Sequence, residues 1–236
     1  MQTMSLTLTD AQVKRRGKSI LGPVSLQLPD QGFTIVIGPN GAGKTTLLKV
    51  LHGVERLSAG TLHYGLPAAE ARQAQAYVFQ SPIMLRRSVA QNLAYPLQLI
   101  GMPKTHSAPL VSDWAARIGL SDMLDRPATR LSGGEKQKLA LGRALIRTPA
   151  VVFLDEPCAN LDARSTRDIE RLLLQAHAGG TRIIMTTHDL GQARRLATDV
   201  LFLLNGQVHD QGPAAPFLTS PATPEARAFL QGDIVE

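Results

Sequence analysis

A glycine-rich segment that ends in a lysine and a threonine is the clearest candidate for chemistry in this sequence. Gly38, Gly41 and Gly43 precede Lys44 and Thr45, which fits the pattern G-x-x-x-x-G-K-[ST]. Glycines let the backbone curl around an anion, and a helix beginning near Lys44 would add the positive end of its dipole. We therefore predict that the segment binds nucleotide phosphates, with Lys44 on the β- and γ-phosphates and Thr45 on Mg²⁺.

The residues on either side favour a binding site over a glycine-rich turn with an incidental lysine. Residues 33–37 are apolar and predict a strand, and residues 46–52 have helical spacing, with Gly53 as the expected C-cap. Strand, glycine loop and helix is the order that a phosphate-binding loop requires. The predicted phosphate-binding residues are Gly38, Pro39, Asn40, Gly41, Ala42, Gly43, Lys44, Thr45 and Thr46.

Two adjacent carboxylates follow a second apolar stretch. Residues 151–154 predict a buried strand, and Asp155 and Glu156 come at its C-terminal end, where ligands bind in open α/β sheets. Because adjacent residues of a strand point to opposite sides, we expect Asp155 to hold Mg²⁺ and Glu156 to polarise the water that attacks the γ-phosphate. A solvated Asp-Glu pair is the alternative, and the phosphate-binding loop makes it less favourable.

A third segment, residues 131–137, opens a predicted helix. Ser132 and Glu135 have the spacing of a capping box, which gives the segment a purely structural explanation. A cap does not need Gly133 and Gly134, but a helix N-terminus that approaches a phosphate closely does. We therefore expect Ser132, Gly133 and Gly134 to contact the nucleotide.

The rest of the chain predicts an α/β fold. Residues 5–9 and 24–28 read as strands between turn signals, whereas residues 81–147 show helical spacings. We expect a single domain in which residues 1–80 and 148–236 form a β-bearing core around an inserted helical subdomain, residues 81–147. The other predicted elements are a strand at 183–187, helices at 168–177, 192–198 and 224–231 with Thr223 as N-cap, and a hairpin of 200–204 and 207–209 that turns at Asn205-Gly206.

The composition narrows the possible functions but does not identify one. The 236 residues carry 25 basic and 19 acidic side chains, and the net charge of +6 suits phosphates, anionic lipid and nucleic acid alike. The basic residues are scattered, which argues against a nucleic-acid groove. No apolar run approaches the roughly 18 residues of a membrane helix, so we expect a cytosolic chain. The single cysteine, Cys158, cannot form an internal disulfide and is interpreted as a packing residue.

In this order and spacing, the motifs resemble those of the nucleotide-binding subunits of ATP-binding cassette (ABC) transporters. The resemblance identifies residues 38–45 as Walker A, residues 151–155 as Walker B and residues 131–135 as the signature motif. It implies a P-loop NTPase (RecA-like) core with an antiparallel β subdomain and an inserted helical subdomain. A P-loop kinase or GTPase would have no signature motif. Soluble ABC ATPases that act on nucleic acid or ribosomes, a further alternative, usually carry a coiled-coil insertion or two cassettes.

The resemblance also assigns roles to three residues that are weak signals alone. Gln80 begins the glutamine loop, which would bind Mg²⁺ and link the nucleotide to the permease contact. His188 would hydrogen-bond the γ-phosphate, and Asp162 would join the two sites of a dimer. Taken alone, His188 reads as a helix cap and Gln80 as a polar loop residue. The catalytic residues that the resemblance implies are Lys44, Gln80, Glu156 and His188.

The family further implies cofactors and partners. ATP and Mg²⁺ would bind between two copies paired head to tail, with residues 132–134 of one copy facing the phosphate loop of the other. Membrane permease subunits and, indirectly, an extracytoplasmic substrate-binding protein complete the assembly, on the cytoplasmic face of the plasma (inner) membrane and without nucleic acid. Arg16 stands where such transporters usually place an aromatic residue, and we expect its guanidinium to stack on the adenine instead.

The segment after Gln80 suggests a cargo. Residues 80–89 resemble the corresponding segment of importers for oxyanions, particularly tungstate, which predicts import of such an anion coupled to ATP hydrolysis. In the alternative, Met84 and Leu85 are ordinary apolar contacts for a permease helix, and Arg86 and Arg87 are solvated. The chain would then serve an importer of another small solute, such as an amino acid.

Overall fold

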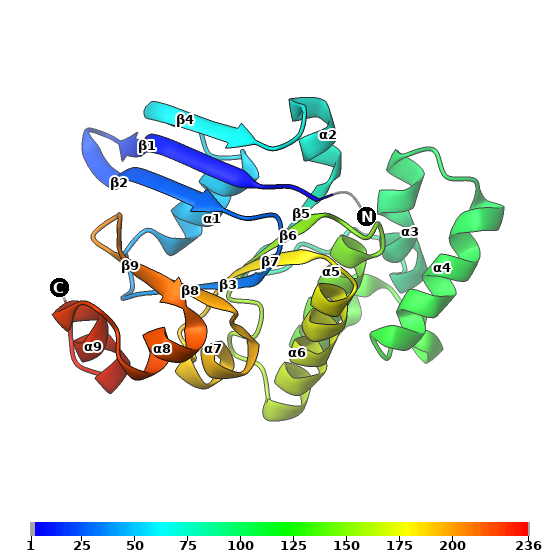
Figure 1. The fold of residues 1–236 in the computed structure, drawn as a ribbon. Helices are drawn as coiled ribbons and strands as arrows, with labels where there is room; N and C mark the ends of the chain where they lie inside the picture. Colours follow the sequence, from blue (N-terminus) through cyan, green and yellow to red (C-terminus); the bar gives the residue numbers. More distant parts are fainter. Residues whose placement is uncertain (1–2, 236) are drawn as a thin grey trace.

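A six-stranded sheet forms the centre of the computed structural model, which describes residues 3–235 (Figure 1). All of its strands run parallel except β9, which pairs antiparallel with β8. Every side chain of β3, β6 and β7 is buried, as expected for parallel strands covered on both faces. The strands lie in the order β5 (Gln75–Val78), β6 (Val151–Asp155), β7 (Arg182–Thr186), β3 (Phe33–Ile37), β8 (Asp199–Leu204) and β9 (Gln207–Pro213).

A smaller antiparallel sheet lies on one side of the central sheet (Figure 1). It contains β2 (Lys18–Leu28), β1 (Leu6–Arg15) and β4 (Ala59–Tyr64), in that order. β1 extends well beyond the predicted residues 5–9. Its pairing with β2 shifts register after Leu8, next to Asp10 with a φ of 48°, and this bulge interrupts the alternation of buried and exposed residues along the strand.

The two faces of the central sheet pack into two different apolar clusters. Helix α1 (Lys44–His52) lies between the two sheets, and its leucines pack with Val36, Phe153 and the inner residues of β1 and β2. On the other face, Phe33 and Ile35 belong to the cluster that includes residues of α5 (Gly133–Leu145), α6 (Ala163–Ala178) and α7 (Leu190–Leu196). Alternate residues of each strand therefore serve opposite faces. The short helices α2 (Ala68–Gln73), α8 (Ala214–Thr219) and α9 (Pro224–Gln231) complete the core.

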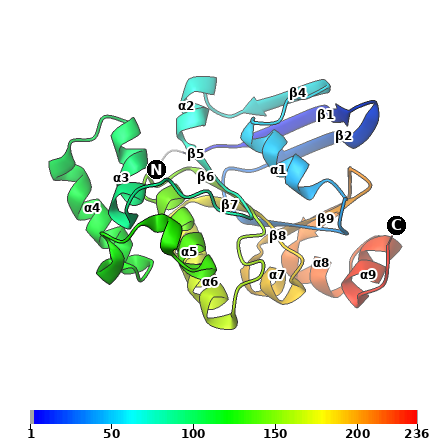
Figure 2. The ribbon, with the colours of Figure 1, turned by 180° about the vertical axis from the view of Figure 1, so that it is seen from behind.

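The segment between β5 and β6 is helical throughout its described regular structure, and its first two helices lie at one end of the molecule (Figure 2). It consists of α3 (Val89–Leu99), α4 (Lys104–Arg117), two single 3₁₀ turns and α5. Its buried residues Leu93 and Trp114 belong to the same apolar cluster as the sheet. None of the helices within residues 3–235 is long and apolar enough to cross a membrane.

Local sequence signals located several element ends, but the strand predicted at residues 24–28 begins at Lys18, the one predicted at 207–209 extends to Pro213, and two helix predictions were wrong at their starts. α6 begins at Ala163 rather than residue 168, and α7 spans Leu190–Leu196 rather than residues 192–198, because Asp162 and Asp189 cap them. The C-cap at Gly53, the hairpin at Asn205-Gly206 and the N-cap at Thr223 are confirmed.

Candidate active site

The predicted site residues follow four strands that lie side by side in the central sheet. β5, β6, β7 and β3 are consecutive neighbours and parallel, so their carboxyl ends share one edge. Gln80 comes after β5, Glu156 after β6, His188 after β7, and the glycine-rich loop after β3. Sheet topology therefore brings these segments to the edge where open α/β sheets bind ligands.

The glycine-rich loop is built to approach an anion with its backbone. Gly38 has a φ of 144°, and a Cβ there would lie 2.1 Å from the carbonyl oxygen of Leu203, so only glycine fits. No side chain caps the start of α1, which leaves its first amides available to a ligand. The Nζ of Lys44 is buried and donates to the carbonyls of Gly38 and Pro39, at 2.8 and 3.0 Å. Burial lowers the pKa of Lys44, and the charges of the two nearby carboxylates oppose that shift.

Asp155 is buried at the end of β6 and held by two hydroxyl groups. Its Oδ1 accepts hydrogen bonds from Thr45 at 3.0 Å and from Thr186 at 2.9 Å. Thr186 is a site residue that the sequence analysis missed. The signal for it is strand register, since Thr186 pairs directly with Asp155 across β6 and β7.

Glu156 stands at a backbone turn rather than on the strand. β6 ends at Asp155, and Glu156 has a φ of 45°. The two carboxylates therefore point in different directions because of this turn. The prediction that they are adjacent residues of one strand was wrong. The amide of Glu156 donates to the hydroxyl of Thr186 at 2.9 Å. Its Oε2 accepts from Nε2 of Gln80 at 3.3 Å and lies 3.3 Å from Nδ1 of His188. The structure thus gathers Gln80, Glu156 and His188 into one cluster.

A pocket covers the glycine-rich loop and includes Glu156 in its lining. One lining residue was not predicted: Ile20, which comes from β2 of the antiparallel sheet. Arg16 lies in the turn between β1 and β2, with a φ of 50° and an exposed side chain, and does not belong to the described lining of this pocket. Arg15 beside it forms an ion pair with Glu55 at 2.5 Å.

The start of α5 forms the capping box that its spacing predicted. The amide of Ser132 donates to Glu135 at 2.7 Å, and the amide of Glu135 donates to the hydroxyl of Ser132 at 3.4 Å. A Cβ at Gly133 would meet no atom within 4 Å, whereas one at Gly134 would lie 2.7 Å from Oγ of Ser165. The capping box therefore leaves Gly133 accessible. Its presence does not exclude that the start of α5 also contacts a second molecule.

Asp162 lies next to this segment and away from the described pocket lining. As the N-cap of α6 it accepts from the amides of Arg164 and Ser165 and from the hydroxyl of Ser165. These hydrogen bonds lower the pKa of Asp162. Because Ser165 also faces Gly134, Asp162 and the start of α5 form one neighbourhood. Elsewhere, burial raises the pKa of the Cys158 thiol to about 11, which suits a packing residue.

Comparison with known proteins decides the family. The family described as ABC transporter matches residues 21–159, which include the glycine-rich loop, Ser132–Gly134 and Glu156. The chain belongs to the ABC transporter family. It is an ATP-binding subunit with an ABC ATPase fold, and it is an enzyme that hydrolyses ATP.

Relatives of this ABC ATPase are named for different transported substrates. It is 36% identical to the tungstate uptake system ATP-binding protein TupC of Peptoclostridium acidaminophilum, over 87% of this chain and 97% of that protein. It is 36% identical to the sn-glycerol-3-phosphate import protein UgpC of Paracoccus denitrificans and 34% to the methionine import protein MetN of Cereibacter sphaeroides, over 87% and 90% of this chain. The chain spans only 60% and 63% of the lengths of those two.

Solved structures agree on the fold. cbiO1 from Clostridium perfringens, described as part of the ABC transporter complex cbiONQ, superposes with a TM-score of 0.82 at 25% identity, over 93% of this chain and 92% of that one. The ATP-binding cassette MJ0796, solved as a dimer with ADP and phosphate, gives a TM-score of 0.78 at 22% identity, over 89% and 98% of the two chains.

Proposed function

We propose that this ABC ATPase binds ATP between two copies paired head to tail and couples its hydrolysis to import through a membrane permease. One observation carries the proposal: the site residues divide into two surfaces. The first is the pocket that holds Lys44, Thr45 and Glu156. The second is the exposed start of α5 with Ser132 and Gly133, which are not part of the described lining of that pocket. A triphosphate in the pocket is enclosed only when the α5 of a second copy covers it.

Closure of the dimer follows from differential binding. ATP contacts both surfaces in the closed pair and one surface in the open pair, so it shifts the population toward the closed pair. Hydrolysis removes the γ-phosphate and with it this difference. The dimeric form described for MJ0796 supports such pairing in this fold.

The cluster around Glu156 supplies the hydrolytic chemistry. Glu156 accepts a proton from the attacking water, and the contacts of its Oε2 with Gln80 and His188 hold the carboxylate in place. His188 has a side chain 66% exposed, so its ring is free to donate to the γ-phosphate. Lys44 exchanges the two loop carbonyls for phosphate oxygens when ATP binds.

The residues at the edge of β6 fit Mg²⁺. This ion prefers oxygen ligands and takes few from protein when a nucleotide provides the rest. Thr45 and Asp155 present oxygens 3.0 Å apart, and Gln80, whose side chain carries an amide oxygen, follows β5 at the same sheet edge. Within residues 3–235 there is no group of three or more His, Cys, Asp and Glu side chains that could hold a metal ion. When bound, the ion would neutralise charge on the phosphates.

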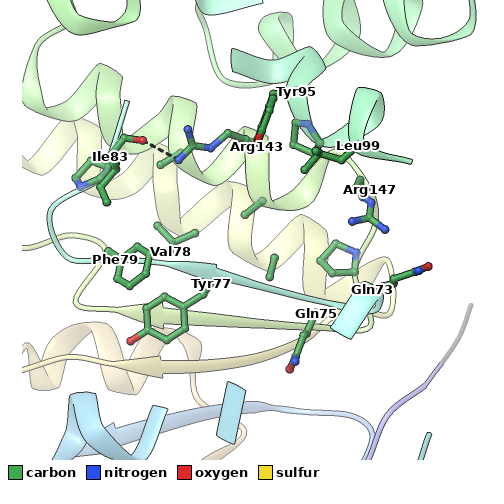
Figure 3. A pocket seen from close by; sticks show the side chains of 16 residues that line it. Gln73, Gln75, Tyr77, Val78, Phe79, Ile83, Tyr95, Leu99, Arg143 and Arg147 are labelled. Carbon is green, nitrogen blue, oxygen red and sulfur yellow. Dashed lines mark hydrogen bonds between the residues drawn. The ribbon is translucent and has the colours of Figure 1, made fainter. Parts of the chain in front are cut away.

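The permease is proposed to dock where β5 meets the helical segment. Figure 3 shows a groove there, with Phe79, Ile83 and Leu99 at its lining. These side chains are 42%, 67% and 66% exposed, which is unusual for large apolar residues that lie together. The groove begins next to Gln80, so a permease segment seated in it would touch the loop that senses the nucleotide. The relative cbiO1, described as part of a transporter complex, supports this assembly.

We propose an oxyanion such as tungstate as the cargo. The similarity to TupC, which covers 87% of this chain and 97% of TupC, supports it. Glycerol-3-phosphate and methionine are the second candidates for the cargo, because UgpC and MetN have a similar sequence identity to this chain. The test is ATPase activity of the subunit reconstituted with its permease and loaded binding proteins. Stimulation by tungstate-loaded protein supports the proposal. Stimulation by an amino-acid-loaded protein, with indifference to tungstate and molybdate, would show that the cargo is a different solute.

Arg16 is proposed to stack on the nucleotide base. Arg15 is held by Glu55, whereas Arg16 is exposed in the same turn, so Arg16 is the guanidinium free to move over a base. Arg16→Ala should weaken ATP binding about three-fold, and Arg16→Tyr should restore it with a larger preference for ATP over GTP. If the affinities for ATP and for GTP in both variants equal those of the wild type, Arg16 does not contact the base.

A further inference from the structure

The loop between β5 and α3 joins the ATP site to the groove without regular structure of its own. Residues 79–88 lie in neither a helix nor a strand. At one end, Gln80 contacts Glu156 at 3.3 Å. In the middle, Ile83 is 67% exposed at the groove (Figure 3). A loop of this kind transmits a displacement only if something outside it fixes its shape.

Asn92 of α3 is one of the groups that fix the loop. Its side chain is fully buried. Its Nδ2 donates to the carbonyls of Leu85, Arg87 and Ser88, at 3.3, 3.3 and 2.9 Å, and its Oδ1 accepts from the amide of Leu85 at 3.1 Å. One buried amide side chain thus contacts four backbone groups of the loop, and it shares its two N–H hydrogens among three carbonyls that also accept backbone amides.

Arg143 of α5 completes the set. Its Nη2 donates to the carbonyl of Ile83 at 2.8 Å, and its Nη1 donates to Oδ1 of Asn92 at 3.4 Å. Figure 3 shows the guanidinium reaching across the groove to Ile83. At Gly142 a Cβ would lie 3.2 Å from Leu93 and from Ile118, so α5 and α3 pack closely at this point. This packing fixes the backbone from which the planar guanidinium of Arg143 extends.

We propose that Arg143 and Asn92 clamp the loop after Gln80 to α3 and α5, so that a movement of Gln80 at the nucleotide is passed to the groove and to α5. They are positioning residues that act through Gln80, because neither lines the pocket over the glycine-rich loop as described in residues 3–235. α5 carries Ser132 and Gly133 at its start, so the same clamp links one copy's Gln80 to the surface it offers to the other copy's ATP. The inference rests on the proposed role of Gln80 in hydrolysis.

The test is a double-mutant cycle on the purified full chain. Arg143→Met keeps the apolar stem but removes the guanidinium, and should lower kcat about ten-fold while KM for ATP changes less than about two-fold. Arg117→Ala is the matched control, since Arg117 is an arginine of α4 that contacts Asp113 and the ring of Trp114 in its own helix and is 54% exposed. Its kcat should stay within about two-fold of the wild type. Thermal melts verify that each variant is folded.

The second arm asks whether Arg143 acts through Gln80. In a Gln80→Ala background, Arg143→Met should change kcat by less than about two-fold, because the residue it positions is gone. The same ten-fold loss in both backgrounds, or a loss equal to that of Arg117→Ala, would overturn the clamp while leaving the role of Gln80 intact. A Gln80→Ala chain with unchanged kcat would instead overturn the role of Gln80 itself. If Arg143→Met does not fold, Arg143→Lys enters the same cycle, since an ammonium cannot bond Ile83 and Asn92 at once.

Discussion

The phosphate-loop surface and the α5 surface of this ABC ATPase differ in how far each is complete by itself. Around the loop, Lys44 is buried with two carbonyl partners, and Asp155 is buried with two hydroxyl partners. At the start of α5, Ser132 and Gly133 are exposed, and the space beside Gly133 is open. The loop surface therefore has the features of a site formed before its ligand arrives, whereas the α5 surface has a finished cap and open space beside Gly133.

The difference separates what folding requires from what assembly requires. Changes on the loop surface remove partners that the folded chain already has, so they should affect both stability and nucleotide binding. A methyl added at Gly133 would meet no described residue beyond its own helix turn, so its main effect should come when a second molecule arrives. The following variants test this division.

The largest effect is expected at Glu156. Glu156→Gln removes the base but keeps the shape and the contact with Gln80, so kcat should fall about 10³-fold while ATP still binds. The variant should then remain closed on ATP and elute as a dimer in size-exclusion chromatography with Mg-ATP, and as a monomer without nucleotide. Single-turnover kinetics and chromatography measure the two effects. Normal turnover would move the base role to another residue, and a monomer saturated with ATP would contradict the two-surface arrangement.

Lys44→Ala should weaken nucleotide binding itself. A hydrogen bond from a charged group contributes about 1.5–3 kcal/mol, so the Kd for ATP should rise about 10- to 100-fold. Titration with a fluorescent ATP analogue measures this change. The control is Lys49→Ala in the same helix, which removes the same charge outside the pocket lining and should leave Kd within about two-fold. Equal losses for the two lysines would mean that general charge, not the buried loop geometry, holds the phosphates.

Gly133→Ala should break assembly without disturbing the folded chain. Among the described residues, the added methyl meets no atom within 4 Å outside its chain neighbours and its own helix backbone, and alanine favours a helix over glycine, so the melting temperature should not fall. The methyl occupies the space meant for the other copy's phosphate, so kcat should fall about ten-fold. Gly134→Ala is the comparison, because its Cβ would lie 2.7 Å from Oγ of Ser165 and should lower stability too. Full activity in Gly133→Ala would remove α5 from the nucleotide site.

The local structure of both surfaces was predictable from the sequence because its signals are local. The strand-loop-helix order around Gly38–Thr45, the cap at Gly53 and the capping box at Ser132 each depend on residues close together in the chain. Thr186 escaped prediction because it reaches Asp155 only through strand register, 31 residues along the chain. The contact between Arg143 and Ile83, 60 residues apart, likewise depends on how α5 packs and has no sequence signature.

Competing assignments explain the errors that remain. Asp162 was predicted to join two nucleotide sites, and its role as the N-cap of α6 was missed. The predicted start of α6 was therefore five residues late. The bulge at Asp10 broke an alternation that continues on both sides of it. The turn at Glu156 replaced the strand geometry assumed for it. In each case a single special residue overrode a periodic pattern.

The smallest effect concerns the cap that Ser132 and Glu135 share. Each alanine variant removes half of the capping box, so each should lower stability by about 1 kcal/mol, measured by urea unfolding. Their activities should separate, because Ser132 is exposed beside Gly133 and Glu135 binds back to the backbone of Ser132. Ser132→Ala should therefore lower kcat well beyond Glu135→Ala at equal stability. Equal activity losses would mean that the segment matters only as a helix start, and the α5 surface would then be as self-sufficient as the phosphate loop.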